Sequence, residues 1–565
     1  MPNFTRIISI VCILVLTACQ YEQAENVKEL LMADEAGQVT SLYANGPQMA
    51  QLHIIQDNEK TADHYIKNNE KFNVEAVIPP QCYTKTDGVH NPCYVCHQSY
   101  SKDNLRPNVM RDGVLQGSYD FSDIGTDNHW TNLFKDRTED IKKISDQEIL
   151  NYINQENYSD LVNWLNSDQW QGEVPVINNL ENGAQAFDAN GLAKDGSRWV
   201  AFNYKPMPST FWPTNGSTDD VMLRLPNEFS EINGKFSRDV YYANLALVEM
   251  AITNKPTISS IAIDEKSLNF DVNADGILSS KVENIVSQTH YLGDASSVKV
   301  EHMLYPLGIE FLHTVRYLGF DEQGNTKVSK RFKEYRYMKK SSHLSKARMA
   351  SVYYGEAKEK HSENLPTAVD FGDKGISNSF GWLLWGFIED ENGNLRKQHD
   401  EEQFFCVGCH KTIGTTIDQT FSFPRKVSGA KGWGYIDLAF IMDVPNINET
   451  QGEYLTYLQR VGGGDEFRQN GEMITRWFDE KGQVKKDKVK ALDNIAQLIT
   501  PSRARALNLN KAYYLVVKEQ SFLFGRDAVL KPAKNVIQKI DTEIQPLEAS
   551  NRHNWDIRLD WDNTL

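Results

Sequence analysis

The pattern of apolar and polar positions changes character along the chain and predicts a mixed α+β fold. Between residues 171 and 340, short β-branched and aromatic stretches are separated by turn signals such as Asn233-Gly234 and Asp275-Gly276. The predicted strands are 199–204, 221–225, 258–263, 310–318 and 328–338. Apolar residues at helical spacing predict helices at 144–153, 161–165, 240–251 and 511–524, the last of them ending at Gly525.

The amino terminus has the features of an export signal. Arg6 precedes an apolar run over 7–16 that is too short to span a bilayer. Leu16-Thr17-Ala18-Cys19 is similar to a bacterial lipobox, in which the cysteine thiol receives the lipid. The alternative is an ordinary signal peptide with a chance cysteine. Because Gln20 rather than Asp follows Cys19, we expect an exported, lipid-anchored protein in the outer membrane, facing the periplasm or the cell surface.

Composition and charge exclude several classes of protein. With 565 residues, 40% hydrophobic and 24% charged, the chain is long enough for a sizeable core and is not disordered. A mean hydropathy of −0.52 excludes a multi-span membrane protein. The formal net charge of −16 argues against nucleic acid as a partner, because phosphate binding requires a basic surface.

Two pentapeptides of the form C-x-x-C-H carry the chemistry of the chain. In such a motif, two thiols on one side of a helical turn add to the vinyl groups of one porphyrin, and the histidine reaches the iron. We therefore expect two haem c groups. Thioether bonds are predicted at Cys93, Cys96, Cys406 and Cys409, and axial ligation of iron at His97 and His410.

The C-x-x-C-H pattern fits two other uses of the thiols, zinc binding and thioredoxin-like redox chemistry, less well. A zinc site made of all four thiols does not require a histidine after each pair, and a thioredoxin-like pair needs a βαβ setting. With its lipobox and two C-x-x-C-H motifs, the chain resembles the c-type cytochromes, and among them a dihaem cytochrome c lipoprotein. The resemblance is limited to these motifs. It implies two haem c groups and redox partner proteins in the cell envelope.

The motifs give the predicted segments their roles. We expect an α+β protein in which two mainly helical c-type haem-binding regions flank a β-rich middle domain. The expected segments are 1–18 as signal peptide, 19–80 as lipidated tether, 81–170 as first haem c domain, 171–340 as β-rich middle domain, 341–445 as second haem c region and 446–565 as helical C-terminal region.

The second axial ligand of each iron distinguishes a carrier from an enzyme, because an open position can bind a small molecule. Candidate distal ligands are His129, Met110, Cys82 and His399. Cys82 has a second interpretation, as a buried and inert thiol. His313 lies in a predicted strand and is interpreted as structural.

Two further patterns suggest ligand binding. Asp271, Asn273 and Asp275, followed by Gly276, match the first half of an EF-hand loop and predict a calcium site. Val282 stands at the position of the usual glutamate, so a polar hairpin turn is the alternative. Residues 327–348 contain nine basic side chains and Glu334 alone as acid, which we interpret as a solvated strand face. The alternatives are binding of haem propionates or docking of an acidic partner.

These patterns predict an envelope-anchored dihaem cytochrome c that transfers electrons to and from redox partner proteins. The alternative is a periplasmic dihaem oxidoreductase that acts on a small molecule such as peroxide or a sulfur oxyanion. The large non-haem body favours this alternative, because an electron shuttle does not need it. A third reading is a structural lipoprotein in which haem provides stability.

Overall fold

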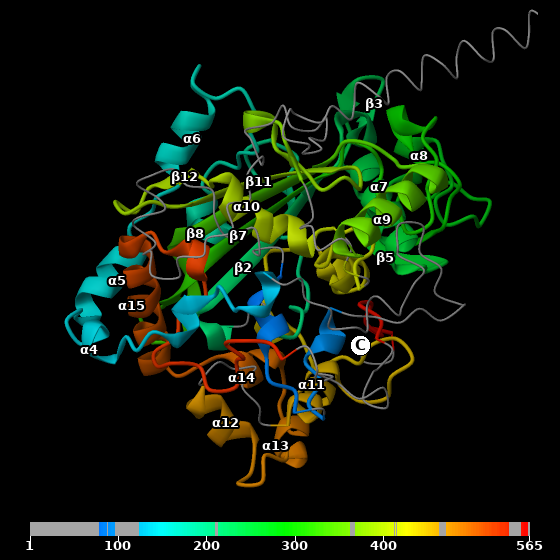
Figure 1. Cartoon of the computed structure of the whole chain (residues 1–565). Helices are drawn as coiled ribbons and strands as arrows, with labels where there is room; N and C mark the ends of the chain where they lie inside the picture. The colour runs from blue at the N-terminus through cyan, green and yellow to red at the C-terminus, as the bar shows by residue number, and fades with distance from the viewer. Residues whose placement is uncertain are drawn as a thin grey trace, which may run out of the picture.

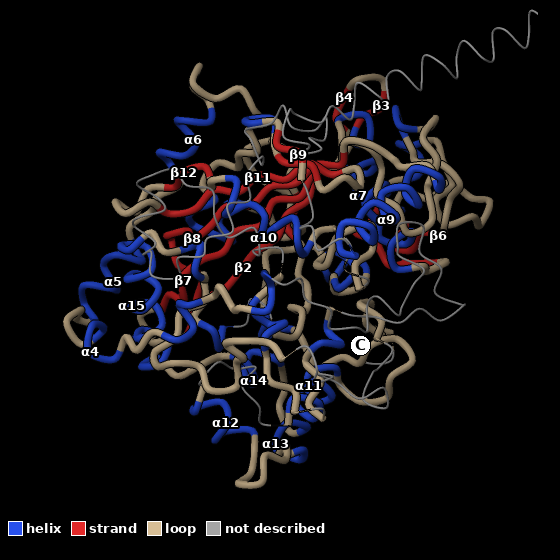
Figure 2. Tube along the Cα trace, in the orientation of Figure 1, coloured by secondary structure: helices blue, strands red, loops and turns tan. Residues whose placement is uncertain are grey.

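The computed structural model describes residues 78–87, 89–96, 124–209, 213–361, 368–411, 413, 415–462, 470–541 and 555–562. Helices and strands are mixed, as the sequence pattern predicts, and one large antiparallel sheet crosses the middle of the molecule (Figures 1 and 2). Within this part of the chain, no helix is both long and apolar enough to cross a membrane.

The central sheet has eight strands in the order β1-β2-β7-β8-β11-β10-β9, and β12 pairs with β11. All of its pairings are antiparallel. The strands are β1 (Val200–Ala201), β2 (Ser217–Arg224), β7 (Glu310–Phe320), β8 (Thr326–Lys340), β9 (Val369–Asp370), β10 (Ile376–Ser377), β11 (Trp382–Glu389) and β12 (Leu395–Lys397). Two small sheets accompany it: β3 (Glu231–Ile232) with β4 (Lys235–Phe236), and β5 (Thr257–Ile263) with β6 (Val282–Val286).

The long hairpin of β7 and β8 confirms the two strands predicted at 310–318 and 328–338. Its turn includes Gly324 at φ +86°, a left-handed conformation that favours glycine. The sheet continues past residue 340, however, into the segment expected to be mainly helical. The strand β11 there is almost wholly buried, and its sequence Trp-Leu-Leu-Trp-Gly-Phe-Ile-Glu has no polar alternation, so it gives a weak strand signal.

Helices surround the sheet and bear out the helical stretches of the sequence. They are α4 (Thr138–Ile141), α5 (Asp146–Asn154), α6 (Ser159–Leu165), α7 (Arg238–Thr253), α8 (Glu265–Leu268), α9 (Lys346–His361), α10 (Asp400–Cys409), α11 (Glu453–Val461), α12 (Gly471–Trp477), α13 (Lys486–Lys490), α14 (Ile495–Ile499) and α15 (Arg503–Glu519). The predicted end of the last helix at Gly525 is wrong. Gln520, at φ +49°, ends α15, and Gly525 follows a separate 3-10 turn, Phe522–Phe524.

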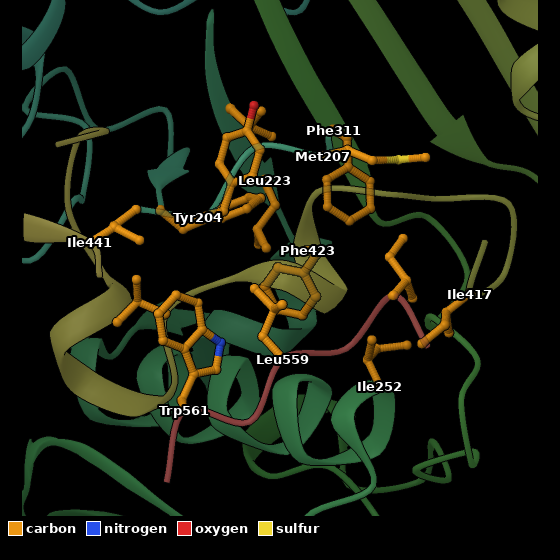
Figure 3. Packing of buried hydrophobic residues seen from close by; sticks show 14 of the residues in the cluster. Tyr204, Met207, Leu223, Ile252, Phe311, Ile417, Phe423, Ile441, Leu559 and Trp561 are labelled. Atoms are coloured by element: carbon orange, nitrogen blue, oxygen red, sulfur yellow. The ribbon is translucent and has the colours of Figure 1, made fainter. Parts of the chain in front are cut away.

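The two faces of the sheet bury different cores. Met222, Leu312 and Trp385 belong to a core that also contains Leu161 and Leu165 of α6. The opposite face contributes to the largest core, which joins segments far apart in the sequence. Figure 3 shows part of this core, where Met207, Phe311 and Phe423 lie close together. The same core includes Val95 of the first motif and Val407 of the second.

Candidate functional site

The second C-x-x-C-H motif occupies the last turn of α10. Three acidic residues, Asp400, Glu401 and Glu402, lie in the first turn of this helix, where negative charge is favourable. Arg396 holds Glu402 with two hydrogen bonds of 2.8 and 2.9 Å, which fixes the start of the helix. At the other end, Cys406 and Cys409 stand one turn apart, and His410 caps the helix. The motif therefore has the helical setting that its spacing predicts.

His410 is held in one orientation by the backbone around it. Its Nδ1 lies 2.8 Å from the carbonyl oxygen of Gln419, and Asn378 donates a 2.6 Å hydrogen bond to the carbonyl oxygen of His410. Because a carbonyl can only accept, Nδ1 carries the proton and the lone pair is on Nε2. Burial lowers the pKa of His410 to about 4, so the ring is neutral at pH 7. A neutral imidazole fixed through its other nitrogen is the usual state of a metal ligand.

The first motif lies against the C-terminal part of the chain. Cys93–Val95 forms a 3-10 turn, and the N–H of Cys96 donates to the carbonyl oxygen of Cys93. Tyr94 is 2% exposed, and the guanidinium of Arg460 lies 4.2 Å from its ring centroid. The ring of Trp555 packs edge-on against Tyr94 at 6.2 Å. His97, the predicted iron ligand of this motif, lies outside the described residues.

One large apolar cavity brings the two motifs together. Its empty volume is about 1340 Å³, with the open space at its mouth included. Cys406, Cys409 and His410 line it from the second motif, and Cys96 lines it from the first, although 313 residues separate Cys93 from Cys406. Apolar side chains complete the wall, including Met207, Phe311, Met338, Leu384, Phe405 and Phe421.

The sheet forms the polar part of the cavity wall. His313 on β7 pairs in register with Val221 on β2 and with Arg336 on β8, and all three line the cavity. The Nε2 atom of His313 lies 3.2 Å from Oδ2 of Asp219, whose side chain is 2% exposed. Burial raises the pKa of the Asp219 carboxyl, and the hydrogen bond with His313 opposes that rise. The sequence pattern placed His313 on a strand but did not show which face it occupies.

A second, more polar pocket of about 750 Å³ shares Gln81, Ser209, Arg336 and Phe405 with the cavity. A β-bulge shapes it: Val315 pairs with Glu334 and Arg316 with Phe332, so Lys333 is an extra residue on β8. The Lys333 ammonium donates to the carbonyl oxygen of Gly216 at 2.7 Å, and burial lowers its pKa to about 7.

Two arginines converge on one carboxylate in this polar pocket. Arg336 and Arg526 each approach Glu334 Oε2, at 2.8 and 2.9 Å. Lys333 and Asp527 are the other charged residues that line the pocket. Its three basic side chains therefore outnumber its two carboxylates.

The basic strip over 327–348 is not a solvated strand face throughout, so that interpretation is wrong. Arg331, Lys333 and Lys340 are buried. Arg331 pairs with Glu389 at 3.2 Å and Lys340 with Asp418, because these β8 side chains point into cores where a charge requires a partner. Lys333 and Arg336 line the polar pocket instead.

Cys82 lies in the 3-10 turn Pro80–Tyr83, next to the cavity-lining residues Pro79 and Gln81. Burial raises the pKa of its thiol, and the nearby Cys93 and Cys409 raise it further. Cys82 is thus close to one cysteine of each motif. No disulfide joins any two of Cys82, Cys93, Cys96, Cys406 and Cys409.

The other candidate distal ligands have different positions. His129 lies beside Trp130, whose ring packs 5.9 Å from that of Phe405 at the second motif. His399 precedes α10 at the end away from Cys409, and its N–H donates to the Glu402 carboxylate at 2.8 Å. Met110 and Cys19, the predicted lipidation residue, lie outside the described residues. The ligand roles of His129, Met110, Cys82 and His399 stay predictions.

The loop with the EF-hand pattern is held by its own hydrogen bonds. Asp271 accepts from the N–H groups of Asp275 and Gly276, at 3.2 and 2.7 Å, and Asn273 donates to Asp275. Glu283, one place beyond the expected ligand position, pairs with Lys281 at 2.7 Å. Among the described residues, no group of three or more His, Cys, Asp or Glu side chains is arranged to hold a metal ion. Calcium at Asp271, Asn273 and Asp275 stays a prediction, and the four thiols are not gathered into such a group in the described part of the chain.

Comparisons with known proteins identify the class. A protein-family model described as a lipoprotein family matches residues 66–498, and the chain belongs to this family. It is also 32% identical, over 533 residues, to an uncharacterized lipoprotein of Aquifex aeolicus, a match that covers 82% of this chain and 88% of the relative. No solved structure matches. The membership supports the predicted export and lipid anchoring.

Proposed function

We propose that this lipoprotein is an envelope-anchored dihaem cytochrome c that accepts and passes single electrons. The observation that supports it most is the shared cavity, where an apolar wall meets Cys406, Cys409, His410 and Cys96. Two thiols one helical turn apart, beside an imidazole with its Nδ1 proton engaged, are the donor set that a covalently bound haem requires. Cys406 and Cys409 would hold one haem, with His410 as its iron ligand.

Cys93 and Cys96 would hold the other haem, with His97 as its ligand. Because Cys96 lines the cavity of the second motif, the two groups would be neighbours despite their separation in sequence. Bound haem supplies a one-electron couple, and the apolar wall would keep water from it and tune its potential. Redox partner proteins of the envelope would exchange electrons with this pair.

The alternative function is a dihaem oxidoreductase for a small molecule such as peroxide or a sulfur oxyanion. The neighbouring polar side chains of His313 and Arg336 on the sheet wall of a largely apolar cavity favour it, because a pure carrier does not need hydrogen-bond donors there.

A potentiometric titration followed by optical spectra tests the proposed function. For the carrier we expect two one-electron steps that are mutually coupled, and two six-coordinate low-spin haems in the oxidised protein. The matched control is Cys93→Ala/Cys96→Ala, which should leave one step at a shifted potential. Two steps that do not influence each other would contradict neighbouring haems, and a protein without a reducible chromophore would contradict the function itself.

A further inference from the structure

The sheet forms one part of the cavity wall, and this part has a feature that electron transfer does not explain. Of the cavity-lining residues on this face, Val221, Phe311, Met338 and Leu384 are apolar, whereas His313 and Arg336 are polar neighbours in register on β7 and β8. Their side chains are 22% and 17% exposed, so both are partly accessible from the cavity. Burying two such groups is unfavourable unless each is held by hydrogen bonds.

Each of the two side chains is fixed by a buried carboxylate. Asp219 holds His313 at 3.2 Å, and Glu334 accepts from Nε of Arg336 at 2.9 Å. Asp219 and Glu334 are 2% and 3% exposed and lie on the same sheet face, since both pair with Val315, two residues along β7 from His313. This arrangement positions an imidazole and a guanidinium side by side with little freedom to reorient, which is how preorganised donor groups are built.

The charges around Arg336 favour an anion. Arg336 and Arg526 share the single carboxylate of Glu334, and Lys333 is turned into the same pocket by the β-bulge. Asp527 is the other acidic residue of that pocket. The polar pocket adjoins the cavity through Arg336 and Phe405, so it offers a polar approach to His313 from outside the apolar region.

We propose that His313 and Arg336 form a binding site for a small inorganic anion in the cavity of Cys406, Cys409 and His410. This proposal rests on the alternative function given above, because the anion would be a ligand or substrate at a haem of the second motif that keeps a position open to a small molecule. Arg336 donates hydrogen bonds to the anion, and His313 donates to it from Nδ1 as an imidazolium, because its Nε2–H is engaged by Asp219. Asp219 and Glu334 are positioning residues. The chain would then have one haem that relays electrons and a second haem site open to a small molecule.

Cyanide is the probe of choice, because it binds ferric haem as an anion, and carbon monoxide on the reduced protein is the uncharged control. Covalent haem content and far-UV circular dichroism are measured first for every variant. We expect the oxidised wild type to bind cyanide at one of its two haems. His313→Ala and Arg336→Gln should each weaken cyanide binding about 10- to 100-fold, the effect of losing one hydrogen bond to a charged group.

The controls separate this site from a general effect on the haem. Carbon monoxide affinity should change less than about threefold in both variants, since an uncharged ligand gains little from these donors. His290→Ala replaces an exposed histidine near the small sheet of β5 and β6 and should bind cyanide like the wild type.

Three results would overturn the proposal. One is unchanged cyanide affinity in both variants, and another is a wild type with two haems that binds no cyanide. The third is a change of His313→Ala from low-spin to high-spin without any added ligand, which would make His313 an axial ligand instead. A protein that carries no covalent haem would overturn the proposed function, and this proposal with it, at the first step of the experiment.

Discussion

At the residue scale, the core contains buried charged side chains that form ion pairs with one another. Glu453 is buried between Arg425 and Lys205, with Nη1 of Arg425 at 2.7 Å and Nζ of Lys205 at 3.3 Å. Removing one member of such a cluster leaves its partners charged and uncompensated. We expect Glu453→Ala to lower the free energy of unfolding by about 3–5 kcal/mol, measured by urea denaturation.

Glu449→Ala is the matched control, because Glu449 is 35% exposed and lies 4.0 Å from Arg460. An ion pair of this kind contributes no more than about 1 kcal/mol. Equal losses in the two variants would contradict the account of the buried cluster.

At the element scale, α15 is joined to the segment before α4 by a partly exposed ion pair. Both carboxylate oxygens of Glu519 accept from Arg137, at 2.8 and 2.9 Å. Burial alone would raise the pKa of Glu519, but the hydrogen bonds and charges of Arg137 and Lys135 lower it to about 2. Because the folded pKa is below that of an unfolded glutamate, the pair stabilises the protein near neutral pH, and the contribution is lost as the pH falls toward 2.

Glu519→Gln should therefore be less stable than the wild type at pH 7, by about 1 kcal/mol since the carboxylate is partly solvated. The difference should shrink between about pH 5 and pH 2. Denaturation curves of both proteins at pH 7 and pH 3 check this, and a difference independent of pH would contradict it.

Elements with a clear period were predictable, and contacts between distant elements were not. Strand-like stretches between turn signals revealed β7 and β8, and the i, i+3 spacing of Cys406 and Cys409 indicated the helical turn that ends α10. The uniform apolar run of β11 concealed a strand. The bulge at Lys333 and the position of His313 opposite Arg336 depend on register between strands, which a single sequence does not contain. The meeting of Cys96 with the second motif depends on long-range packing for the same reason.

At the scale of the whole molecule, the body is expected to be held at the membrane through its amino terminus. Lipidation at Cys19 is the prediction that accounts for this, and membership in the lipoprotein family supports it. Cys19→Ser should abolish labelling with a radioactive fatty acid and release the protein into the soluble fraction. Cys12→Ser, within the predicted signal, should be labelled normally. Normal labelling of Cys19→Ser would contradict the anchor.

The central claim is that the chain carries two covalently attached haems, one at each motif, and the mass of the denatured protein tests it most directly. The protein is expressed with a haem-attachment system, unfolded, and weighed intact by mass spectrometry. We expect the mature chain plus two haems, with one haem left in Cys406→Ala/Cys409→Ala and one in Cys93→Ala/Cys96→Ala. A mature chain that carries no haem under these conditions would contradict the account.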